Sequence, residues 1–465
     1  MVRDSDIYEW DWLHTEKTLD SSYIATFYDT SGNALSKLEN ITTHIRRGKN
    51  YEIIVSISFS SQGSLRDISE NMANLGDLKI VSDYSEYIFS DYFDLNSLVK
   101  FGAGNPSISL EVKYKKLQVN FRKSGEAAFH NEWYLNGLSS DISMPDVLEF
   151  SQEITYSWNI NGTNEKKITY TPKSSVSRNT AIIKGDGVPT FLLSCVPDKF
   201  GKFVSKNTTI EYRSEFGDIP DKKTRKSIEE ITGFVIGNHL INIGYTSYDE
   251  TGKLVEVCVL QPESYLNLET LRNSPARYRP VNLNVYNHGR NIGVILPQIL
   301  KIYLERKDEL MLDIVFYSYW LSQTLPLEHT LPVLQNGFEV LVKRILREDE
   351  TKPLKFRHPD KEKMGKKSGF FDALRFICDT KLNLEIGDLE KNAVALRNEM
   401  THSRILWETM SDEMREGALS KLLTYYTLFN RIILRSLGYE GEYIDWATTE
   451  LSKHLVSRPI IKGAE

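Results

Sequence analysis

The apolar residues of this chain change their spacing near Gln298, and that change limits the folds the chain can adopt. Before this point, segments such as 108–114 alternate apolar and polar residues, a period of two that is typical of strands with one buried face. After it, apolar residues recur every three or four positions, as in amphipathic helices. The sequence therefore predicts an α+β protein, with a β-rich first half followed by an antiparallel helical bundle.

Strands and turns of the first half are predicted from this alternation. The segment 117–121 repeats the pattern of 108–114 after a short break, which predicts two consecutive strands. Hairpin loops are expected at 29–33 and 249–252, where glycine stands among polar residues. Further strands are predicted at 51–59, 168–171, 190–196, 208–212, 239–245 and 253–260, and helices at 65–75 and 225–234.

Five helices are predicted in the second half, at 304–321, 332–346, 370–382, 389–404 and 419–437. Pro332 would occupy the first position of its helix, where the missing N–H costs nothing. The proline-containing stretch before these helices is the expected connection. The predicted organisation is a β-rich region of one or two subdomains at 1–265, a connection at 266–297 and a helical domain at 298–465.

Composition and charge exclude several classes of protein. The formal net charge is -6, so any contact with nucleic acid has to rest on a local basic patch. No stretch of roughly 18 apolar residues predicts a membrane span, and the charged N-terminus does not resemble a signal peptide, so a cytoplasmic protein without membrane contact is expected. The three cysteines have no CxxC spacing, and no His, Asp and Glu cluster has metal-ligand spacing, so no metal or cofactor is expected.

The helix predicted at 389–404 separates its residues by face. Its apolar residues are spaced four, three and four apart and form one stripe, which predicts the core face of this helix: Leu389, Ala393, Leu396 and Met400. Asn398 and His402 are one turn apart on the other side, and Arg397 flanks the stripe with a side chain long enough to reach His402. Such a helix offers these three polar residues to solvent, a ligand or a second chain.

The run Arg397-Asn398-x3-His402, in a late helix of a helical bundle, resembles the Arg-x4–6-His motif of HEPN domains, in which a polar residue follows the arginine. The pairing with a long β-rich half resembles ApeA-like HEPN proteins of bacterial anti-phage defence. This resemblance covers the domain plan and roughly residues 300–450. It implies an HEPN-like bundle, a sensing or regulatory role for 1–265, and Glu339 as a polar residue that supports the motif.

An HEPN domain of this kind implies a metal-independent endoribonuclease that acts as a homodimer, with both motifs lining one cleft. The implied partners are RNA, with tRNA as one candidate, and a phage protein as the trigger; no cofactor is implied. The residue types suit this chemistry, because His402 can move protons near neutral pH and Arg397 offers fixed donors to phosphate oxygens. Asn398 would hold the imidazole or contact the ribose, and the products would be a 2′,3′-cyclic phosphate and a 5′-OH.

A basic segment lies between the second and third predicted helices. Residues 352–367 hold seven lysines and arginines against two acids. The segment is either a grip on the RNA backbone or a solvated loop, and its composition favours neither. Its candidate RNA-binding residues are Lys352, Lys355, Arg357, Lys361, Lys363, Lys366 and Lys367.

Two other interpretations remain open at this point. The first is a non-catalytic HEPN-like dimerisation module that carries a β-rich ligand- or protein-binding domain. The second is a carbohydrate-binding or structural protein, in which the pairing of Arg397 with His402 is accidental. Facing motifs across a twofold axis would support a shared site, whereas a row of exposed aromatic residues on the first half would favour the carbohydrate-binding class.

Overall fold

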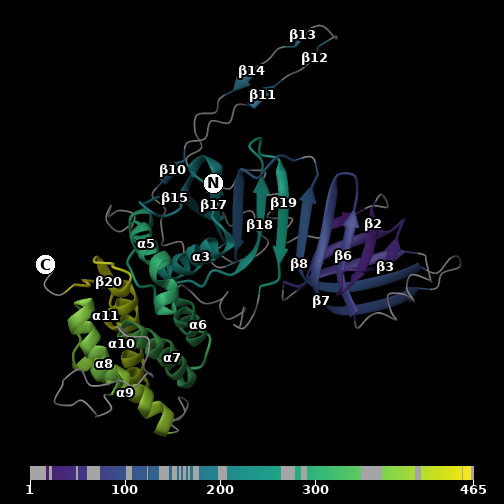
Figure 1. Cartoon of the computed structure of the whole chain (residues 1–465). Helices are drawn as coiled ribbons and strands as arrows, with labels where there is room; N and C mark the ends of the chain where they lie inside the picture. Colours follow the sequence, from purple (N-terminus) through teal and green to yellow (C-terminus); the bar gives the residue numbers. More distant parts are fainter. Residues whose placement is uncertain are drawn as a thin grey trace.

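The computed structural model describes eighteen stretches of the chain: residues 17–19, 23–48, 51–59, 74–100, 107–122, 124–135, 146–148, 154–156, 159–160, 164–165, 168–170, 177–196, 207–262, 278–283, 291–346, 369–403, 410–452 and 454–461. In these stretches strands dominate the first half and helices the second (Figure 1). The protein is therefore α+β, as the change of period near Gln298 predicts.

Fifteen strands form one antiparallel sheet. They are β1 (Lys17–Leu19), β2 (Ile24–Asp29), β3 (Ala34–Leu38), β4 (Thr42–Arg47), β5 (Ile53–Phe59), β6 (Leu75–Val81), β7 (Ser85–Lys100), β8 (Ser107–Phe121), β9 (Phe129–Tyr134), β10 (Asp146–Leu148), β15 (Ser177–Ile183), β16 (Phe191–Val196), β17 (Asn207–Arg213), β18 (Asn242–Tyr248) and β19 (Leu254–Leu260). Their order in the main path is β10-β15-β16-β17-β9-β18-β19-β8-β7-β6-β2-β3.

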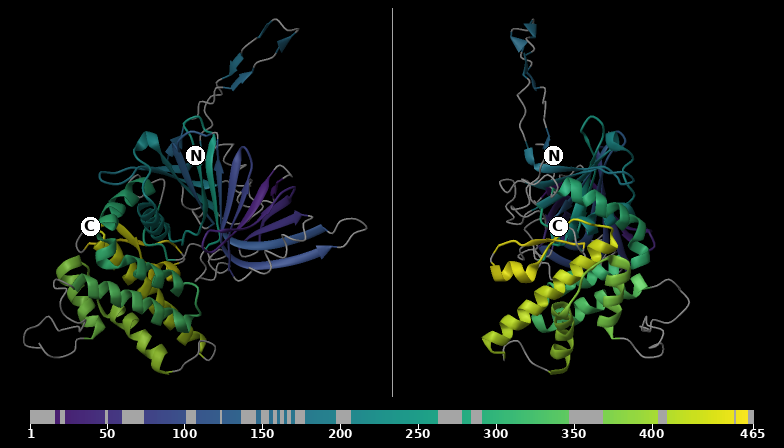
Figure 2. Two further views of the ribbon diagram at one scale, coloured as in Figure 1. Left: turned by 45° about the vertical axis from the view of Figure 1, so that its right-hand side comes forward. Right: turned by 90° about the vertical axis from the view of Figure 1, so that its left-hand side faces the viewer.

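The sheet branches at β8. The first part of this strand pairs with β5 between Ile108 and Tyr114, and its second part pairs with β19 between Lys116 and Asn120. Strands β4 and β1 extend the branch that starts at β5. Figure 2 shows the strands fanning apart around β7 and β8. Because β8 pairs with β5 and with β19, it belongs to both branches of the sheet, and the buried residues of the two branches form one core.

The course of β8 corrects one prediction. The strand runs unbroken from Ser107 to Phe121, so the prediction of two strands with a break between them is wrong. Its buried residues are Leu110, Val112 and Tyr114, and then Leu117 and Val119, so the alternation shifts by one position at 115–116. This shift, at the point where the strand changes partners, produced the apparent break.

Smaller strands lie outside the main sheet. The pairs β11 (Ile154–Tyr156) with β14 (Ile168–Tyr170) and β12 (Asn159–Ile160) with β13 (Asn164–Glu165) stand away from the body in Figure 1. A third pair, β20 (Glu442–Ile444) with β21 (Ser457–Pro459), lies near the C-terminus.

Both predicted hairpin loops are confirmed. Asp29 ends β2 and Asp249 directly follows β18; each accepts hydrogen bonds from backbone N–H groups of its own turn, at 2.7 Å from Asn33 and 2.9 Å from Thr251. The strands predicted at 51–59, 190–196, 208–212 and 253–260 correspond to β5, β16, β17 and β19, while β18 begins later than predicted, at Asn242. The helix predicted at 65–75 lies outside the described residues, apart from its last positions, where β6 begins.

The helices are α3 (Lys222–Ile236) in the first half and, in the second, α5 (Ile292–Leu310), α6 (Leu312–Ser322), α7 (Leu327–Leu346), α8 (Phe370–Ile377), α9 (Asp388–Ser403), α10 (Asp412–Ser436) and α11 (Trp446–Ser452). A single π-helical turn, η6 (Cys378–Leu382), continues α8. The side chain of Asp221 caps α3 by accepting from the Thr224 N–H at 2.7 Å, and Gly237 ends it in the left-handed conformation.

Three helix predictions are wrong in detail, one of them because α10 begins at Asp412 and not at 419. The helix predicted at 304–321 is two helices, because Met311 adopts a left-handed conformation (φ 53°) between α5 and α6. The break leaves Leu310 and Leu312 both fully buried, and no glycine or proline marks it in the sequence. Pro332 lies inside α7 and not at its start, because α7 already begins at Leu327.

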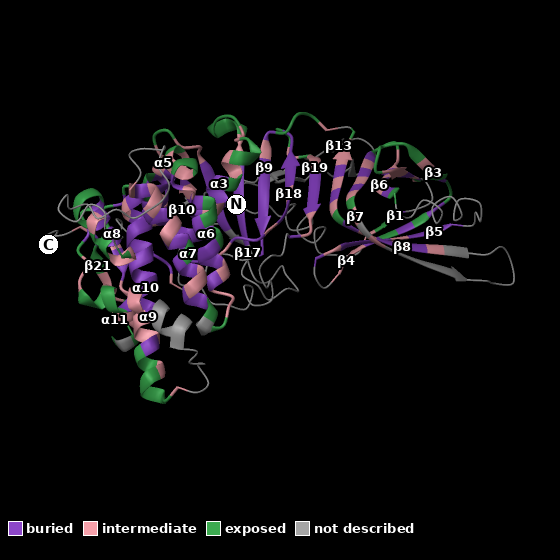
Figure 3. Cartoon of the chain, turned by 60° about the horizontal axis from the view of Figure 1, so that its bottom comes forward, coloured by how far each residue is buried: buried purple, intermediate pink, exposed green. Residues whose placement is uncertain are grey.

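The two halves share their buried interior. One apolar cluster runs from the strands through α3 into the helical half, and Figure 3 shows buried residues along this whole path. Residues 278–283 also lie against the helices: the backbone oxygen of Tyr278 accepts from the Tyr319 hydroxyl at 3.0 Å and from the Asn430 amide at 2.7 Å. The predicted boundaries at 265 and 298 stay a prediction, although α5 already begins at Ile292.

Candidate active site

Helix α9 carries the predicted motif along one continuous backbone. It spans Asp388–Ser403 and packs against α10 and α7. Two side chains of this helix, Ala393 and Leu396, are buried, at 0% and 3% exposure. At about 100° per residue, the α-carbons of Asn398 and His402 lie on the side of the helix away from Ala393. The side chains of 397–403 lie outside the described part of the structure, so the catalytic roles of Arg397, Asn398 and His402 stay predictions.

Leu389 corrects the predicted core face of α9. Its side chain is 75% exposed, although it lies on the same helical stripe as Ala393 and Leu396. The angle around the helix was predicted correctly, but in the described structure no neighbouring element covers the side chain of Leu389. Helical periodicity gives the direction of a side chain and says nothing about what packs there.

The N-terminal end of α9 is fixed by polar contacts. Glu390 accepts a hydrogen bond from the Gly387 N–H at 2.9 Å and pairs with Arg431 of α10 at 3.1 Å. Arg431 is buried, donates to the Glu385 carbonyl at 2.7 Å and lies 4.9 Å from the ring of Tyr443. The predicted catalytic residues lie near the opposite end of the same helix. The contacts of Glu390 therefore hold α9 at the end away from them.

Glu339 lies on α7, within a chain of hydrogen bonds. Its carboxylate accepts from the Gln335 amide at 3.0 Å and from Lys343 at 3.4 Å. Gln335 in turn accepts from the hydroxyl of Tyr425 on α10. The supporting role of Glu339 stays a prediction, but its side chain is held by neighbours on the helix that packs against α9. The basic segment 352–367 lies wholly outside the described residues.

The sheet carries a buried polar cluster that the sequence did not predict. The carboxylate of Glu132 on β9 accepts from Arg225 of α3 at 2.9 Å and from Tyr134 at 2.7 Å, and lies 3.7 Å from His130. His130 also contacts the hydroxyl of Ser247 at 3.0 Å. Burial by itself would raise the pKa of Glu132, but His130, Tyr134 and Arg225 outweigh it and lower that pKa.

Two further titratable groups have shifted pKa values: Glu229, which is buried beside this cluster, and His239, which is partly buried and lies 5.4 Å from the ring of Trp320. Burial raises the pKa of Glu229 on α3 to about 7, although Lys226 pairs with it. Burial lowers the pKa of His239 to about 3, so this imidazole is neutral in the folded protein. The alternation of His130 and Glu132 in a strand is the sole sequence signal for these contacts, and it is equally typical of a solvated face.

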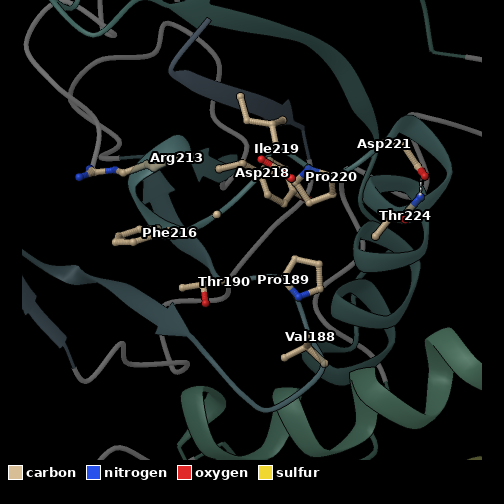
Figure 4. Close-up of a pocket in the computed structure, with 12 residues that line it drawn as sticks. Val188, Pro189, Thr190, Arg213, Phe216, Asp218, Ile219, Pro220, Asp221 and Thr224 are labelled. Carbon is tan, nitrogen blue, oxygen red and sulfur yellow. Dashed lines mark hydrogen bonds between the residues drawn. The ribbon is translucent and has the colours of Figure 1, made fainter.

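A cavity of about 440 Å³ opens where α3 begins, between the β15–β16 loop and the segment after β17 (Figure 4). Arg213 and Phe216 lie on one side of it, and Asp221 and Thr224 lie on the other. Arg213 is already paired with Glu211 and Glu215, and Asp221 already caps α3. Arg213 and Asp221 are therefore engaged within the protein, and the lining by itself selects no ligand class.

Thiol chemistry has little support at the described cysteines. Burial raises the pKa of Cys258 to about 11 and that of Cys378 to about 12, so neither thiol is a nucleophile near neutral pH. Within the described ranges, no three His, Cys, Asp or Glu side chains gather as a metal site would require. Among the helices that the structure describes, none is both long enough and apolar enough to cross a membrane.

Comparison with known proteins adds no family assignment. No protein-family model matches the sequence, and no curated protein or solved structure is significantly similar to it. Any functional conclusion therefore rests on the residues of this chain and on the arrangement of its helices.

Proposed function

We propose that the helical half is a metal-independent, HEPN-type endoribonuclease whose catalytic residues are Arg397, Asn398 and His402. The observation that carries the proposal is the course of α9. This helix is anchored to α10 at its first turn and continues through Ser403, with positions 398 and 402 away from the buried Ala393.

The chemistry needs few groups. The RNA 2′-OH is the nucleophile, so the protein has to move protons and to stabilise a crowded, doubly charged phosphorane. His402 takes or gives a proton, Arg397 donates to the phosphate oxygens, and Asn398 orients the imidazole or the ribose. Cleavage by this route leaves a 2′,3′-cyclic phosphate and a 5′-OH without a metal.

A homodimer through the helical halves completes the proposed site. One α9 supplies one histidine, whereas the reaction uses both a proton acceptor and a proton donor. A twofold axis beside α9 would bring two copies of His402 and Arg397 to one phosphate. The β-rich half would then hold the nuclease inactive until a phage protein releases it, as anti-phage defence requires, and the RNA cleaved would be cellular or viral, with tRNA as one candidate.

An RNA-cleavage assay in excess EDTA tests the proposal. We expect cleavage by the wild type with cyclic phosphate ends, and a loss of about 10²-fold or more in His402→Ala, the range typical of a general acid or base. His454→Ala is the matched control, because His454 is an exposed histidine that lies outside α9, between α11 and β21. Equal cleavage by His402→Ala, or strict dependence on Mg²⁺, would rule the mechanism out.

The second candidate is a non-catalytic dimerisation module that serves a β-rich binding domain. The cavity beside α3 favours it, because a binding half needs a concave surface. A dimer that cleaves no RNA under any condition, with or without the phage trigger, would select this candidate over the nuclease.

A further inference from the structure

Helix α3 belongs to the first half of the sequence, but it lies between the sheet and the first helices of the second half (Figure 1, Figure 2). At about 100° per residue, its positions 223, 227, 230 and 234 share one face. Positions 225, 228, 229 and 232 share the opposite face. The contacts of the helix follow this division.

The face with Arg225 holds α3 to the sheet. Arg225 donates to Glu132 of β9 at 2.9 Å, and the two side chains are 15% and 8% exposed. A second nitrogen of Arg225 donates to the Pro220 carbonyl at 2.6 Å, just before the helix starts. An ion pair this well buried breaks only with a large loss of stability, because each partner would be left in a medium that solvates charge poorly.

The opposite face holds α3 to the helical half. Glu230 accepts from the hydroxyl of Tyr303 at 2.8 Å and pairs with Lys307, both on α5. Lys307 also donates to Ser227 at 3.3 Å. One turn further on, the ring of Phe234 stacks on Phe316 of α6, with centroids 5.1 Å apart.

From Phe234 a row of aromatic rings continues toward α7. Phe234 lies 5.9 Å from Tyr319 of α6, and Tyr319 stacks on Phe429 of α10 at 5.6 Å. Phe429 contacts Phe338 of α7 at 5.0 Å. Phe338 is the neighbour of Glu339 on the helix that packs against α9. Close-packed rings cannot shift singly, so a displacement of α3 moves its neighbours too.

We infer that α3 transmits displacements of the β-rich half to α5–α7 and, through α7, to α9, in addition to the direct contact of α5 with β15. A ligand or protein that shifts β9 and β17 would displace α3 by way of Arg225, and Glu230 would pass the displacement to α5. The coupling is reciprocal, so an event at α9 also reaches the sheet. The regulation of RNA cleavage by this route rests on the proposed function; the coupling itself does not.

Hydrogen exchange in the full-length protein, without RNA, tests the coupling. In Arg225→Met, which alters only the sheet side of α3, we expect the amides of α7 and α9 to exchange about tenfold faster. Lys113→Met is the matched control, because Lys113 forms an ion pair with Asp94 in the sheet but away from α3, at 2.7 Å. There the exchange of α9 should change less than about twofold.

A second variant separates transmission from general destabilisation. In Lys307→Met the contact of α3 with α5 is already weakened. Adding Arg225→Met to this variant should therefore change the amide exchange rates of α9 by less than about twofold. Faster exchange in β9 and β17 with no change in α9 would overturn the inference, as would equal effects of Arg225→Met and Lys113→Met on α9.

Two provisions keep this test independent of folding and of the nuclease. If Arg225→Met does not fold, Glu132→Gln removes the charge and keeps the shape, and the same criteria apply. RNA cleavage is measured in parallel. A protein that cleaves no RNA but shows the expected exchange pattern would contradict the proposed nuclease function and support the coupling through α3.

Discussion

The β-rich half and the helical half bury different chemistry. Beneath α3, the sheet buries an acid, a base and an ion pair within a few ångströms, around Glu132, Arg225 and His130. The centre of the helical half is aromatic, with Tyr319, Phe429 and their neighbours packed ring against ring. Buried charges depend on each partner being present, whereas packed rings depend on volume. The stability of the cluster around Glu132 should therefore depend on single charges and on pH, and that of the aromatic centre of the helical half on cavities.

The largest effect is expected from Glu132→Ala, which leaves Arg225 buried without its carboxylate. Removing one partner of a buried pair costs about 3–5 kcal/mol, so the free energy of unfolding should fall by that amount in urea denaturation. Glu39→Ala is the control: the pair of Glu39 with Lys37 is 60% exposed on both sides, and its loss should cost less than about 1 kcal/mol. Similar losses in both variants would show that the burial of Glu132 and Arg225 does not set the cost of breaking their ion pair.

A cavity in the helical half should come next. Leu396→Ala removes a buried side chain from the core face of α9 and should cost about 2–5 kcal/mol, equally at pH 5 and pH 8, because no charge is involved. The exposed Leu389 provides the comparison on the same helix, and Leu389→Ala should stay within about 0.5 kcal/mol. A large loss in Leu389→Ala would mean that a second chain covers this residue in solution.

The smallest effect concerns pH and Glu229. Its pKa is raised from 4.5 to about 7 in the folded protein, so the folded chain keeps a proton that the unfolded chain releases between these values. The stabilisation is complete below about pH 4.5 and is lost as the pH rises through about 7. Relative to the wild type, Glu229→Gln should therefore be about 2–3 kcal/mol more stable at pH 8 than at pH 5.

The comparison between variants is needed because His239 acts in the opposite direction. Its pKa is lowered from 6.5 to about 3, so its contribution is present above pH 6.5 and is lost as the pH falls. The pH dependence of wild-type stability contains the contributions of both groups. The difference in the free energy of unfolding between wild type and Glu229→Gln contains that of Glu229 alone. Denaturant unfolding at five pH values measures it, with Glu305→Gln on the exposed side of α5 as the control. A flat difference would show that Glu229 is not buried as a neutral acid.

Local patterns predicted much of the fold. The alternation of β5 and β19, the aspartate and glycine of the two hairpin turns, and the spacing in α9 are properties of neighbouring residues, and the structure has each of these elements. Patterns with two readings were less reliable. The shift of the alternation at 115–116 in β8 looked like a break between two strands. Met311 adopts a left-handed conformation without being glycine, so the sequence did not indicate the break between α5 and α6.

The sequence by itself determined the change from strands to helices along the chain and the spacing of Arg397, Asn398 and His402 on one helix, because backbone periodicity acts over a few residues. Tertiary structure alone decided which polar residues are buried. Glu132 and Arg225 are 93 positions apart, and nothing near either one shows that α3 will lie on β9. It also decided that α3 joins the two halves and that Leu389 stays exposed. Burial is a property of two surfaces that meet, and only the folded chain brings them together.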